Sequence, residues 1–388
     1  MVNRKFKIGE YQLMKRIGNI YSKICDIDNI AVAHKMARKD KIHYTEVQKV
    51  DANPDYYFAE IQKMLVNKTY KVGEYKCKTI DERGKQRLIM KLPYYPDRII
   101  QWAVMLQIEQ YFIKTLCYHS CASIPCAGNA RVHKLMNKYR QLYDYNYCLD
   151  IDIRKFYPNI DRDILKTQLE RKFKDKDLLW LLFQIVDSSP KDENSLDDEY
   201  IRGIPIGSYL SQYLANFYLA HFDHWLKEEK HLKCVVRYMD NIIILSNDKN
   251  KLHQLRKEIE TYLWENLHLK LKGNWQVYPL SARPIDFIGY RYGKDYTLLR
   301  KATCQRFKRL CYKIHRNNYC SEHDYRSLTS YYGVLKWCDS KRLWSKYYSF
   351  ILPILKRQGY YIKPFNPNAT KGGNNNDKGT SDRKQNRF

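Results

Sequence analysis

Long apolar runs are scarce in this sequence, and their scarcity narrows the classes of protein to which it can belong. The mean hydropathy is −0.66, and no apolar run approaches the roughly 18 residues that a membrane-spanning helix needs. The first residues, MVNRKFKIGEYQ, lack an apolar segment after their basic residues, so they do not predict a signal peptide. We therefore expect a cytoplasmic protein that has no membrane partner.

Paired cysteines are missing as well. The chain has eleven Cys, an odd number, but no C-x-x-C pair. Two loose clusters, at 117–126 with His119 and at 304–311 with His315, lack the ligand spacing of structural zinc sites. We expect these cysteines to be buried, reduced thiols.

Acidic residues are outnumbered in the composition. The chain has 42 Asp and Glu against 69 Lys and Arg, which gives a net charge of +27. So large an excess of one sign opposes compaction, and the phosphate backbone of a nucleic acid is the commonest partner that would neutralise it. Aromatic residues make up 14% of the chain, and aromatic rings among basic residues suit stacking on bases. The composition therefore favours a nucleic-acid-binding protein.

The spacing of apolar residues predicts a mixed α+β fold. Helices are expected at 11–72, 99–116, 161–173, 177–189, within 203–229, at 251–267 and at 303–360. Two strands joined by a turn are predicted at 75–93, a strand at 145–158, a hairpin at 235–245, and short strands within 270–280 and 286–293. This order favours an antiparallel sheet backed by helices over a parallel doubly wound sheet.

Two acidic residues lie at predicted strand ends, Asp152 in LDIDIRKFY and Asp240 in RYMDN. If their strands are neighbours, the two carboxylates converge on one face of the sheet. Such a pair suits Mg²⁺, which takes one or two carboxylates together with phosphate oxygens and water. Two ions about 3.5–4 Å apart can activate an attacking hydroxyl and stabilise a leaving pyrophosphate. Asp150 competes with Asp152, because residues 150 and 152 point the same way on a strand.

Five blocks of the sequence occur in the order found in reverse transcriptases. DIRKFY resembles the first catalytic block of that family, and RYMDN resembles its Tyr-x-Asp-Asp block. KQRLIMKLPYYPDRIIQWA resembles the fingers block, while LKLKGNW and FIGYRY resemble the two later blocks. The chain thus resembles an RNA-directed DNA polymerase over most of its length.

The resemblance implies a right-hand polymerase with fingers, a palm and a thumb. We expect an N-terminal helical region at 1–72, fingers and palm at 73–295, a helical thumb at 296–364 and a disordered basic tail at 365–388. The expected partners are a template RNA, its RNA/cDNA duplex and dNTPs. Two Mg²⁺ ions would serve as cofactors, with Mn²⁺ as an alternative.

The resemblance also implies the residues that hold the metal. Asp152 and Asp240 would be catalytic metal ligands, joined by the carbonyl of Ile153 and by Asn241, which stands where the family has a second Asp. Lys272 would protonate the leaving pyrophosphate, and Lys270 competes with it for this role.

Substrate-binding residues follow from the same blocks. The implied dNTP-binding residues are Lys85, Arg87, Tyr157, Ile206, Gly207 and Gln212. The implied primer grip consists of Phe287, Ile288, Gly289 and Tyr290. Tyr157 would be the gate that disfavours a 2′-hydroxyl, and Ile206 would line the nascent base pair, where a Gln is usual.

The pattern IGSYLSQ narrows the subfamily, because it resembles a signature of diversity-generating retroelement reverse transcriptases. This likeness implies an error-prone, bacterial or phage-encoded enzyme that works with a small, basic, helical accessory protein forming a pentamer. Two alternatives stay open. One is an intron-type or phage-defence reverse transcriptase. The other is a catalytically weakened RNA-binding scaffold, which is suggested by Asn241.

Overall fold

The computed structural model describes residues 16–81, 86–188, 202–205 and 208–362, with the backbone alone at 80 and 86–88. The chain packs as two compact units, which are described separately below. One consists of Met1–Tyr139 and Tyr143–Tyr278, and the other of Arg140–Leu142 and Pro279–Phe388. The predicted tail at 365–388 lies outside the described residues.

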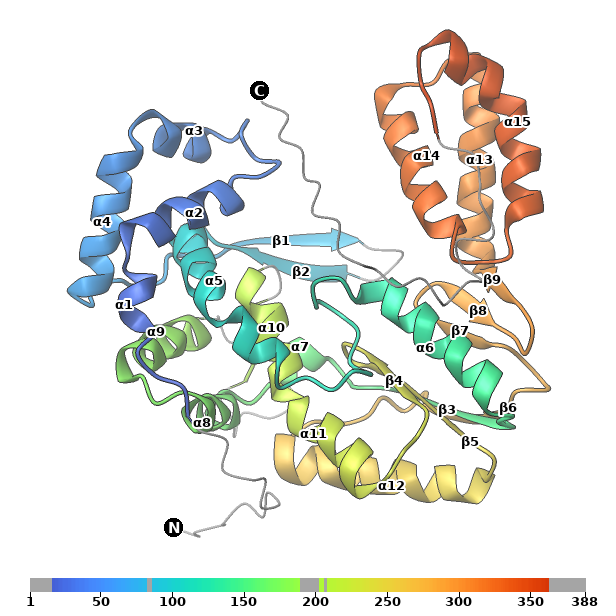
Figure 1. The fold of residues 1–388 in the computed structure, drawn as a ribbon, viewed down its shortest axis with the longest axis horizontal. Coiled ribbons are helices and arrows are strands. Elements are labelled where there is room, and N and C mark those ends of the chain that lie inside the picture. The colour runs from blue at the N-terminus through green and yellow to red at the C-terminus, as the bar shows by residue number, and fades with distance from the viewer. Residues whose placement is uncertain (1–15, 82–85, 189–201, 206–207, 363–388) are drawn as a thin grey trace, which may run out of the picture. The chain divides into compact units, whose positions relative to one another are not determined.

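Helices dominate the first part of the N-terminal unit. They are α1 (Tyr21–Ile24), α2 (Ile27–Ala37), α3 (Thr45–Ala52), α4 (Pro54–Val66) and α5 (Ile99–Ile113). Asp26 caps α2 by accepting a hydrogen bond from the amide of Asp28, and Pro54 opens α4 at a position where the missing N–H costs nothing. Helices α2 and α5 lie side by side (Figure 1). The predicted helical region is confirmed over 21–66.

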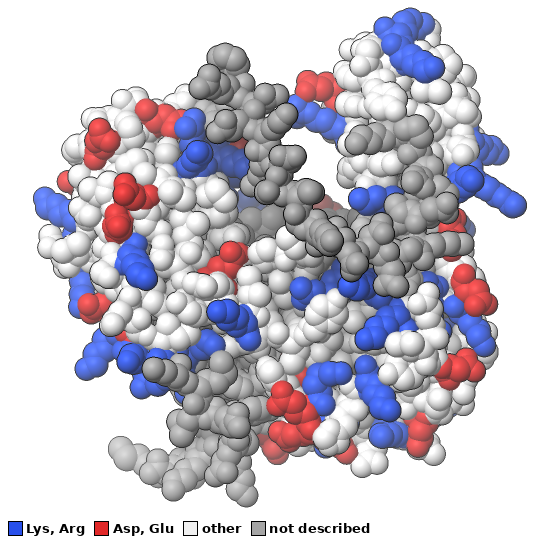
Figure 2. Space-filling view, viewed as in Figure 1, with Lys and Arg blue, Asp and Glu red and all other residues white. Residues whose placement is uncertain are grey.

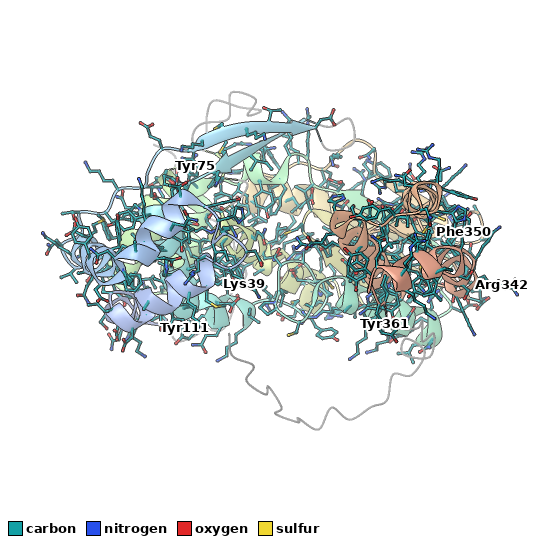
Figure 3. The ribbon with its side chains drawn as sticks, turned by 90° about the horizontal axis from the view of Figure 1, so that it is seen from above. Lys39, Tyr75, Tyr111, Arg342, Phe350 and Tyr361 are labelled. Carbon is teal, nitrogen blue, oxygen red and sulfur yellow. The ribbon has the colours of Figure 1, made fainter. Side chains whose placement is uncertain are left out.

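The predicted pair of strands at 75–93 is also confirmed. Strands β1 (Lys76–Asp81) and β2 (Gln86–Lys91) pair antiparallel, from Lys76 opposite Lys91 to Asp81 opposite Gln86. Tyr75 lies at the foot of this ribbon (Figure 3), and its hydroxyl is 2.8 Å from the Ser188 hydroxyl.

A four-stranded sheet forms the centre of the N-terminal unit, in the order β4-β5-β3-β6. The strands are β3 (Tyr147–Asp152), β4 (Val235–Tyr238), β5 (Asn241–Ser246) and β6 (Gln276–Pro279). Helix α12 (Lys249–Leu267) packs along β3 and β5 (Figure 1). Leu149, Ile151, Ile242 and Ile244 belong to the main core. Because side chains alternate along a strand, Asp150 and Asp152 point to the opposite face.

The strand predicted at 145–158 ends earlier than expected, at Asp152. Lys155 takes a left-handed backbone conformation with φ of 43°, and α7 (Phe156–Asn159) follows. Phe156 is buried in the core, and the Asn159 side chain donates a hydrogen bond to the Arg154 carbonyl. These contacts bend the chain off the sheet although no Gly marks the bend.

The chain forms further helices between β2 and β4. They are α6 (Gly128–Leu142), α8 (Arg162–Lys172), α9 (Lys176–Asp187), α10 (Tyr209–Tyr218) and α11 (Ala220–His224), with π-helical segments at Tyr94–Arg98 and Trp225–Glu229. The single helix predicted within 203–229 is therefore broken into α10, α11 and a π-helical turn. The sequence pattern did not predict α6. No helix among the described residues is long and apolar enough to span a membrane.

The C-terminal unit combines a small sheet with three helices. Strands β7 (Ile285–Phe287), β8 (Tyr290–Tyr292) and β9 (Thr297–Leu299) pair antiparallel. Helices α13 (Lys301–Asn317), α14 (Glu322–Leu335) and α15 (Lys341–Arg357) enclose a core that includes Phe307, Leu328 and Trp344.

Hydrogen bonds join the small sheet to the helices of this unit. The Tyr290 hydroxyl donates to the Val334 carbonyl at 2.9 Å, and the Thr297 amide donates to the Asp339 carboxylate at 2.8 Å. These bonds fasten β8 and β9 to the helices, within the compact unit that includes Pro279–Phe388. The division into fingers and palm at 73–295 and a thumb at 296–364 stays a prediction. Figure 2 shows Lys and Arg on the visible faces of both units.

Candidate active site

A tight turn presents Asp240 at the end of the central sheet. Tyr238 pairs with Asn241 in the antiparallel hairpin β4–β5, so Met239 and Asp240 form a two-residue turn. This confirms the hairpin predicted at 235–245. Met239 has a φ of 56°, a conformation that costs a non-Gly residue about 1–2 kcal/mol.

Strand β3 places Asp152 beside this turn. Asp152 lies directly opposite Asn241 in the register of β3 and β5, whereas Asp150 lies opposite Ile243, farther from the turn. The Ile153 amide donates a hydrogen bond to the Asp240 carbonyl at 3.0 Å. Of the two candidates for the first catalytic position, the structure thus brings Asp152 next to Asp240.

The two carboxylates are close enough to affect each other. Burial first, and then the negative charge of Asp152, raise the pKa of Asp240 from its ordinary 3.8 to about 6. The Asn241 side-chain amide is 3.5 Å from Asp240 Oδ1. Two carboxylates and an amide therefore converge at one end of the sheet.

Lys272 reaches this cluster and Lys270 does not. The Lys272 ammonium donates a hydrogen bond to Asp152 Oδ1 at 2.5 Å, and the Lys272 amide donates to the Asp152 carbonyl at 2.8 Å. The Lys270 ammonium instead lies over the Trp264 ring, 4.5 Å from its centroid. Residues 270 and 272 point to the same side of an extended chain, so the register decides between them. The bridge between Ile153 and Leu271 puts Lys272 opposite Asp152 and Lys270 opposite Arg154, whose amide donates to the Lys270 carbonyl at 2.8 Å.

Tyr157 lies against the turn from α7 rather than from a strand. Its hydroxyl is 3.8 Å from the Met239 sulfur. Burial and then the nearby charge of Asp240 raise the pKa of Tyr157 to about 12. The tyrosine is therefore a neutral side chain next to the carboxylate pair.

The remaining predicted residues are less completely placed. Lys85, Ile206 and Gly207 lie outside the described residues, and Arg87 is on β2 opposite Ile80 with only its backbone described. Gln212 is exposed on α10.

The four residues predicted as a primer grip lie in the C-terminal unit. Phe287 and Tyr290 are buried and pair across the β7–β8 hairpin, with Ile288 and Gly289 at its turn. Their role as a primer grip stays a prediction.

The donor set fits a divalent cation that keeps much of its water. Among the described residues, no three His, Cys, Asp or Glu side chains form a ready-made metal cage. Two carboxylates with open coordination positions are nevertheless what Mg²⁺ uses when substrate phosphates supply further ligands. A cation between Asp152 and Asp240 would also offset the repulsion that raises the pKa of Asp240.

The sequence analysis did not single out the polar side chains beneath the turn. Arg237 is fully buried and pairs with Asp223, which is also fully buried. A signal for them was present, because an Arg inside the apolar run VVRYM cannot be buried without an acidic partner.

Comparison with known proteins places this site in a family. Residues 68–292 match the family described as Reverse transcriptase (RNA-dependent DNA polymerase), a match that covers more than half of the chain. The chain belongs to the reverse transcriptase family. This assignment confirms the predicted class of enzyme, and the matched residues include both carboxylates and Lys272.

Two yeast proteins are among the relatives of this reverse transcriptase. The COX1/OXI3 intron 1 protein of Saccharomyces cerevisiae is 23% identical over 133 residues, which cover 34% of this chain and 16% of that protein. The intron 2 protein is 21% identical over 249 residues, covering 50% of this chain and 29% of that protein. The chain therefore spans less than a third of either relative. Both come from yeast, so these comparisons do not support the predicted bacterial or phage origin.

A telomerase is among the solved structures with a similar fold. Telomerase from Candida albicans, in complex with a TWJ fragment of telomeric RNA, has a TM-score of 0.50 and 13% sequence identity. The similarity covers 74% of this reverse transcriptase and 55% of the telomerase chain. At this identity the likeness concerns the fold alone, and it confirms the predicted α+β polymerase class.

Proposed function

We propose that this chain copies a template RNA into cDNA by adding dNTPs to the 3′ end of a primer. The observation that carries the proposal is the convergence of Asp152 and Asp240 within the part of the chain that matches the family. Paired carboxylates with little other titratable chemistry are suited to metal-assisted phosphoryl transfer.

The metal site has a defined set of candidate ligands. Asp152 and Asp240 would hold two Mg²⁺ ions, or Mn²⁺, with the Ile153 carbonyl and Asn241 as further ligands. The bound ions would activate the attacking 3′-hydroxyl and neutralise the charge of the departing pyrophosphate. The Lys272 ammonium donates a hydrogen bond to Asp152 and would supply a proton to the departing pyrophosphate.

Substrate contacts are proposed for residues around this centre. Tyr157 would act as the gate against a 2′-hydroxyl, and its contact with the Met239 sulfur supports a place beside the incoming sugar. Lys85 and Arg87 would hold the triphosphate, while Ile206, Gly207 and Gln212 would border the new base pair. Phe287–Tyr290 would support the primer end.

The test is primer extension on poly(rA)/oligo(dT), with dTTP and either Mg²⁺ or Mn²⁺. We expect synthesis by the unmodified chain and none by Asp240→Ala, which serves as the blank. Absence of synthesis with both ions would instead support the RNA-binding scaffold that Asn241 suggests.

A finer proposal concerns the biological role. The IGSYLSQ pattern supports an error-prone enzyme of a diversity-generating retroelement, working with a template RNA and a small, basic, pentameric accessory protein. An Ile at 206 cannot make the hydrogen bonds that a Gln would offer near the base pair. We expect Ile206→Gln to lower misincorporation, particularly at template adenines. An unchanged error spectrum in sequenced cDNA would contradict this role for Ile206.

The yeast intron relatives favour a second candidate, an intron-type reverse transcriptase. The genome around the gene separates the two. A neighbouring pair of template and variable repeats is expected for a diversity-generating element, whereas surrounding intron sequence would favour the second candidate.

A further inference from the structure

Arg237 is the largest fully buried side chain among the described residues. It lies on β4, two residues before Met239, between the apolar Val236 and the half-buried Tyr238. Burying a guanidinium without partners costs several kcal/mol, on the order of the stability of a whole domain. A buried Arg at this place therefore needs a structural or functional reason.

All five N–H groups of Arg237 have acceptors. Nε and Nη2 donate to the two carboxylate oxygens of Asp223, at 2.7 and 2.5 Å. Nη2 also donates to the Ser120 hydroxyl at 2.8 Å. Nη1 donates to the Asn216 side-chain oxygen at 3.2 Å and to the Met239 carbonyl at 2.9 Å. Since a guanidinium has five such donors, the group is completely satisfied.

The acceptors are themselves held in place by other elements. Burial disfavours the charged form of Asp223, on α11, but Arg237 and then His119 outweigh burial and lower the pKa of Asp223 to about 2. His119 Nε2 is 3.3 Å from Asp223 Oδ1. Asn216, on α10, donates its amide to the Ala122 carbonyl at 2.8 Å, which turns its oxygen toward Arg237. The guanidinium is thus anchored to two helices and a loop.

The one contact that Arg237 makes with the turn is with the peptide that precedes Asp240. The Met239 carbonyl is held by Arg237, and the Asp240 carbonyl is held by the Ile153 amide at 3.0 Å. The peptide planes on both sides of Asp240 are therefore fixed. The second of these bonds comes from the residue that follows Asp152.

We propose that Arg237 is a positioning residue, which holds the strained Met239 turn so that the Asp240 carboxylate faces Asp152. Because the metal-binding role of Asp240 is itself proposed above, this assignment rests on the proposed function. An ion pair needed only for stability could be replaced by apolar side chains at little cost. The bond to the Met239 carbonyl would be lost in that replacement, and the geometry of the carboxylate pair with it.

The test compares two substitutions around the same guanidinium. Arg237→Lys keeps a positive charge for Asp223 but cannot make the fork and the bond to Met239 together. Ser120→Ala removes another hydrogen bond of the same group, one that does not involve the turn, and is the matched control. Thermal unfolding followed by circular dichroism establishes that both variants are folded.

The first readout is hydrogen exchange of the peptides that contain Ile153 and Met239–Asn241. We expect exchange at least about tenfold faster in Arg237→Lys, with the rest of the sheet unchanged, and no change in Ser120→Ala. The second is calorimetric binding of Mn²⁺ without nucleotide, which we expect to weaken about tenfold in Arg237→Lys, as for other residues that orient metal ligands. In primer extension, kcat should fall while the KM for dTTP stays within about twofold.

Unchanged exchange and Mn²⁺ affinity in a folded Arg237→Lys would overturn the assignment. An equal loss in Ser120→Ala would also overturn it, because the effect would then belong to the buried network as a whole. If Arg237→Lys does not fold, the pair Arg237→Met with Asp223→Leu removes both charges together, and the same readouts decide. If the unmodified chain extends no primer, the proposed function fails, whereas the exchange comparison still tests whether Arg237 holds the turn.

Discussion

Two hairpins of this reverse transcriptase have turns of the same length, but the turns differ in their second residue and in the side chains around them. In β4–β5 the turn is Met239–Asp240, and in β7–β8 it is Ile288–Gly289. Both begin with a non-Gly residue at positive φ, 56° for Met239 and 44° for Ile288. The second residue differs, because Gly289 has a φ of 92° while Asp240 needs no such conformation.

The surroundings of the two turns differ in the same way. The residues next to Ile288 and Gly289, Phe287 and Tyr290, are buried apolar anchors, and the Tyr290 hydroxyl bonds to the Val334 carbonyl. The β4–β5 turn is held instead by the charged, fully buried Arg237. The β7–β8 turn, which carries no carboxylate, is held by Gly289 and by the packing of buried aromatic residues. A turn that must hold a carboxylate in one orientation has a polar network beneath it.

Removal of the turn carboxylate should have the largest effect. We expect Asp240→Ala to reduce the rate of primer extension by at least about 10³-fold, because one of the two charges proposed to hold the metal is lost. The melting temperature should not fall, because burial disfavours the charged form of the Asp240 carboxylate and so does not stabilise the fold. A variant that retains a tenth of the activity would contradict a metal-binding role.

The charge of Asp240 should make the contribution of the β4–β5 hairpin to the free energy of unfolding depend on pH. The contribution of the β7–β8 hairpin should not depend on pH. Its folded pKa of about 6 exceeds its ordinary value of 3.8, so an unfolded chain loses this proton first and stability falls as the pH rises from about 4 to 6. Without metal at pH 7.5, we expect Asp240→Asn to raise the free energy of unfolding by about 1–3 kcal/mol.

Denaturant unfolding over pH 4 to 7.5 checks this expectation. The gain from Asp240→Asn should shrink as the pH falls toward 4, and saturating Mg²⁺ should reduce it at pH 7.5. A gain that is constant across this range would show that the charge of Asp240 is not its source.

The glycine of the other hairpin should carry the next largest effect. A Cβ on Gly289 would meet nothing within 4 Å, so Gly289→Ala costs only the strain of a φ of 92°, about 1–2 kcal/mol. Gly333, within α14 of the same unit, also has open space around it. Gly333→Ala should stabilise the chain by about 0.5–1 kcal/mol, since Ala favours a helix.

Chemical denaturation of the two alanine variants measures the expected loss of stability in Gly289→Ala and the expected gain in Gly333→Ala. Mn²⁺ binding should be unchanged in each, because neither lies in the unit that contains the carboxylates. Equal shifts in the same direction would mean that the conformation of Gly289 is not what the hairpin requires.

The smallest expected effect comes from adding a carboxylate next to Asp240, at the first residue of β5. Asn241→Asp should tighten Mg²⁺ binding by about three- to tenfold, because a carboxylate attracts the ion more strongly than an amide. Asn247→Asp adds the same charge at an exposed position just beyond β5 and should change the affinity by less than about twofold. Calorimetric titration of both variants makes the comparison, and equal affinities would argue against Asn241 as a ligand.

Most of the elements and both carboxylates could be predicted from the sequence, because they depend on local patterns. The β4–β5 hairpin follows from an acidic residue between two β-branched runs, and the ribbon at 76–91 follows from two strands around a turn-forming segment. Helix α6 was missed, because its Gly at the start and its basic residues hide a short apolar stripe at Val132, Leu135, Met136 and Tyr139.

The choices between similar residues came from the tertiary structure. Asp150 and Asp152 share a strand face, so only the register with β5 brings Asp152 to the turn. Lys270 and Lys272 also share a face, and the register at the bridge of Ile153 and Leu271 puts Lys272, not Lys270, opposite Asp152. Strand β3 ends at Asp152 because Phe156 and Asn159 find partners off the sheet.

The sequence by itself determined the chemistry of this protein: a basic, aromatic-rich chain with two acids at strand ends in the block order of a reverse transcriptase. Only the tertiary structure decided how Asp240 is held, because Arg237, Asp223, Asn216 and Ser120 come from four separate segments. A buried charge needs partners whose directions depend on packing, and a pattern along the chain carries no information on which segments meet.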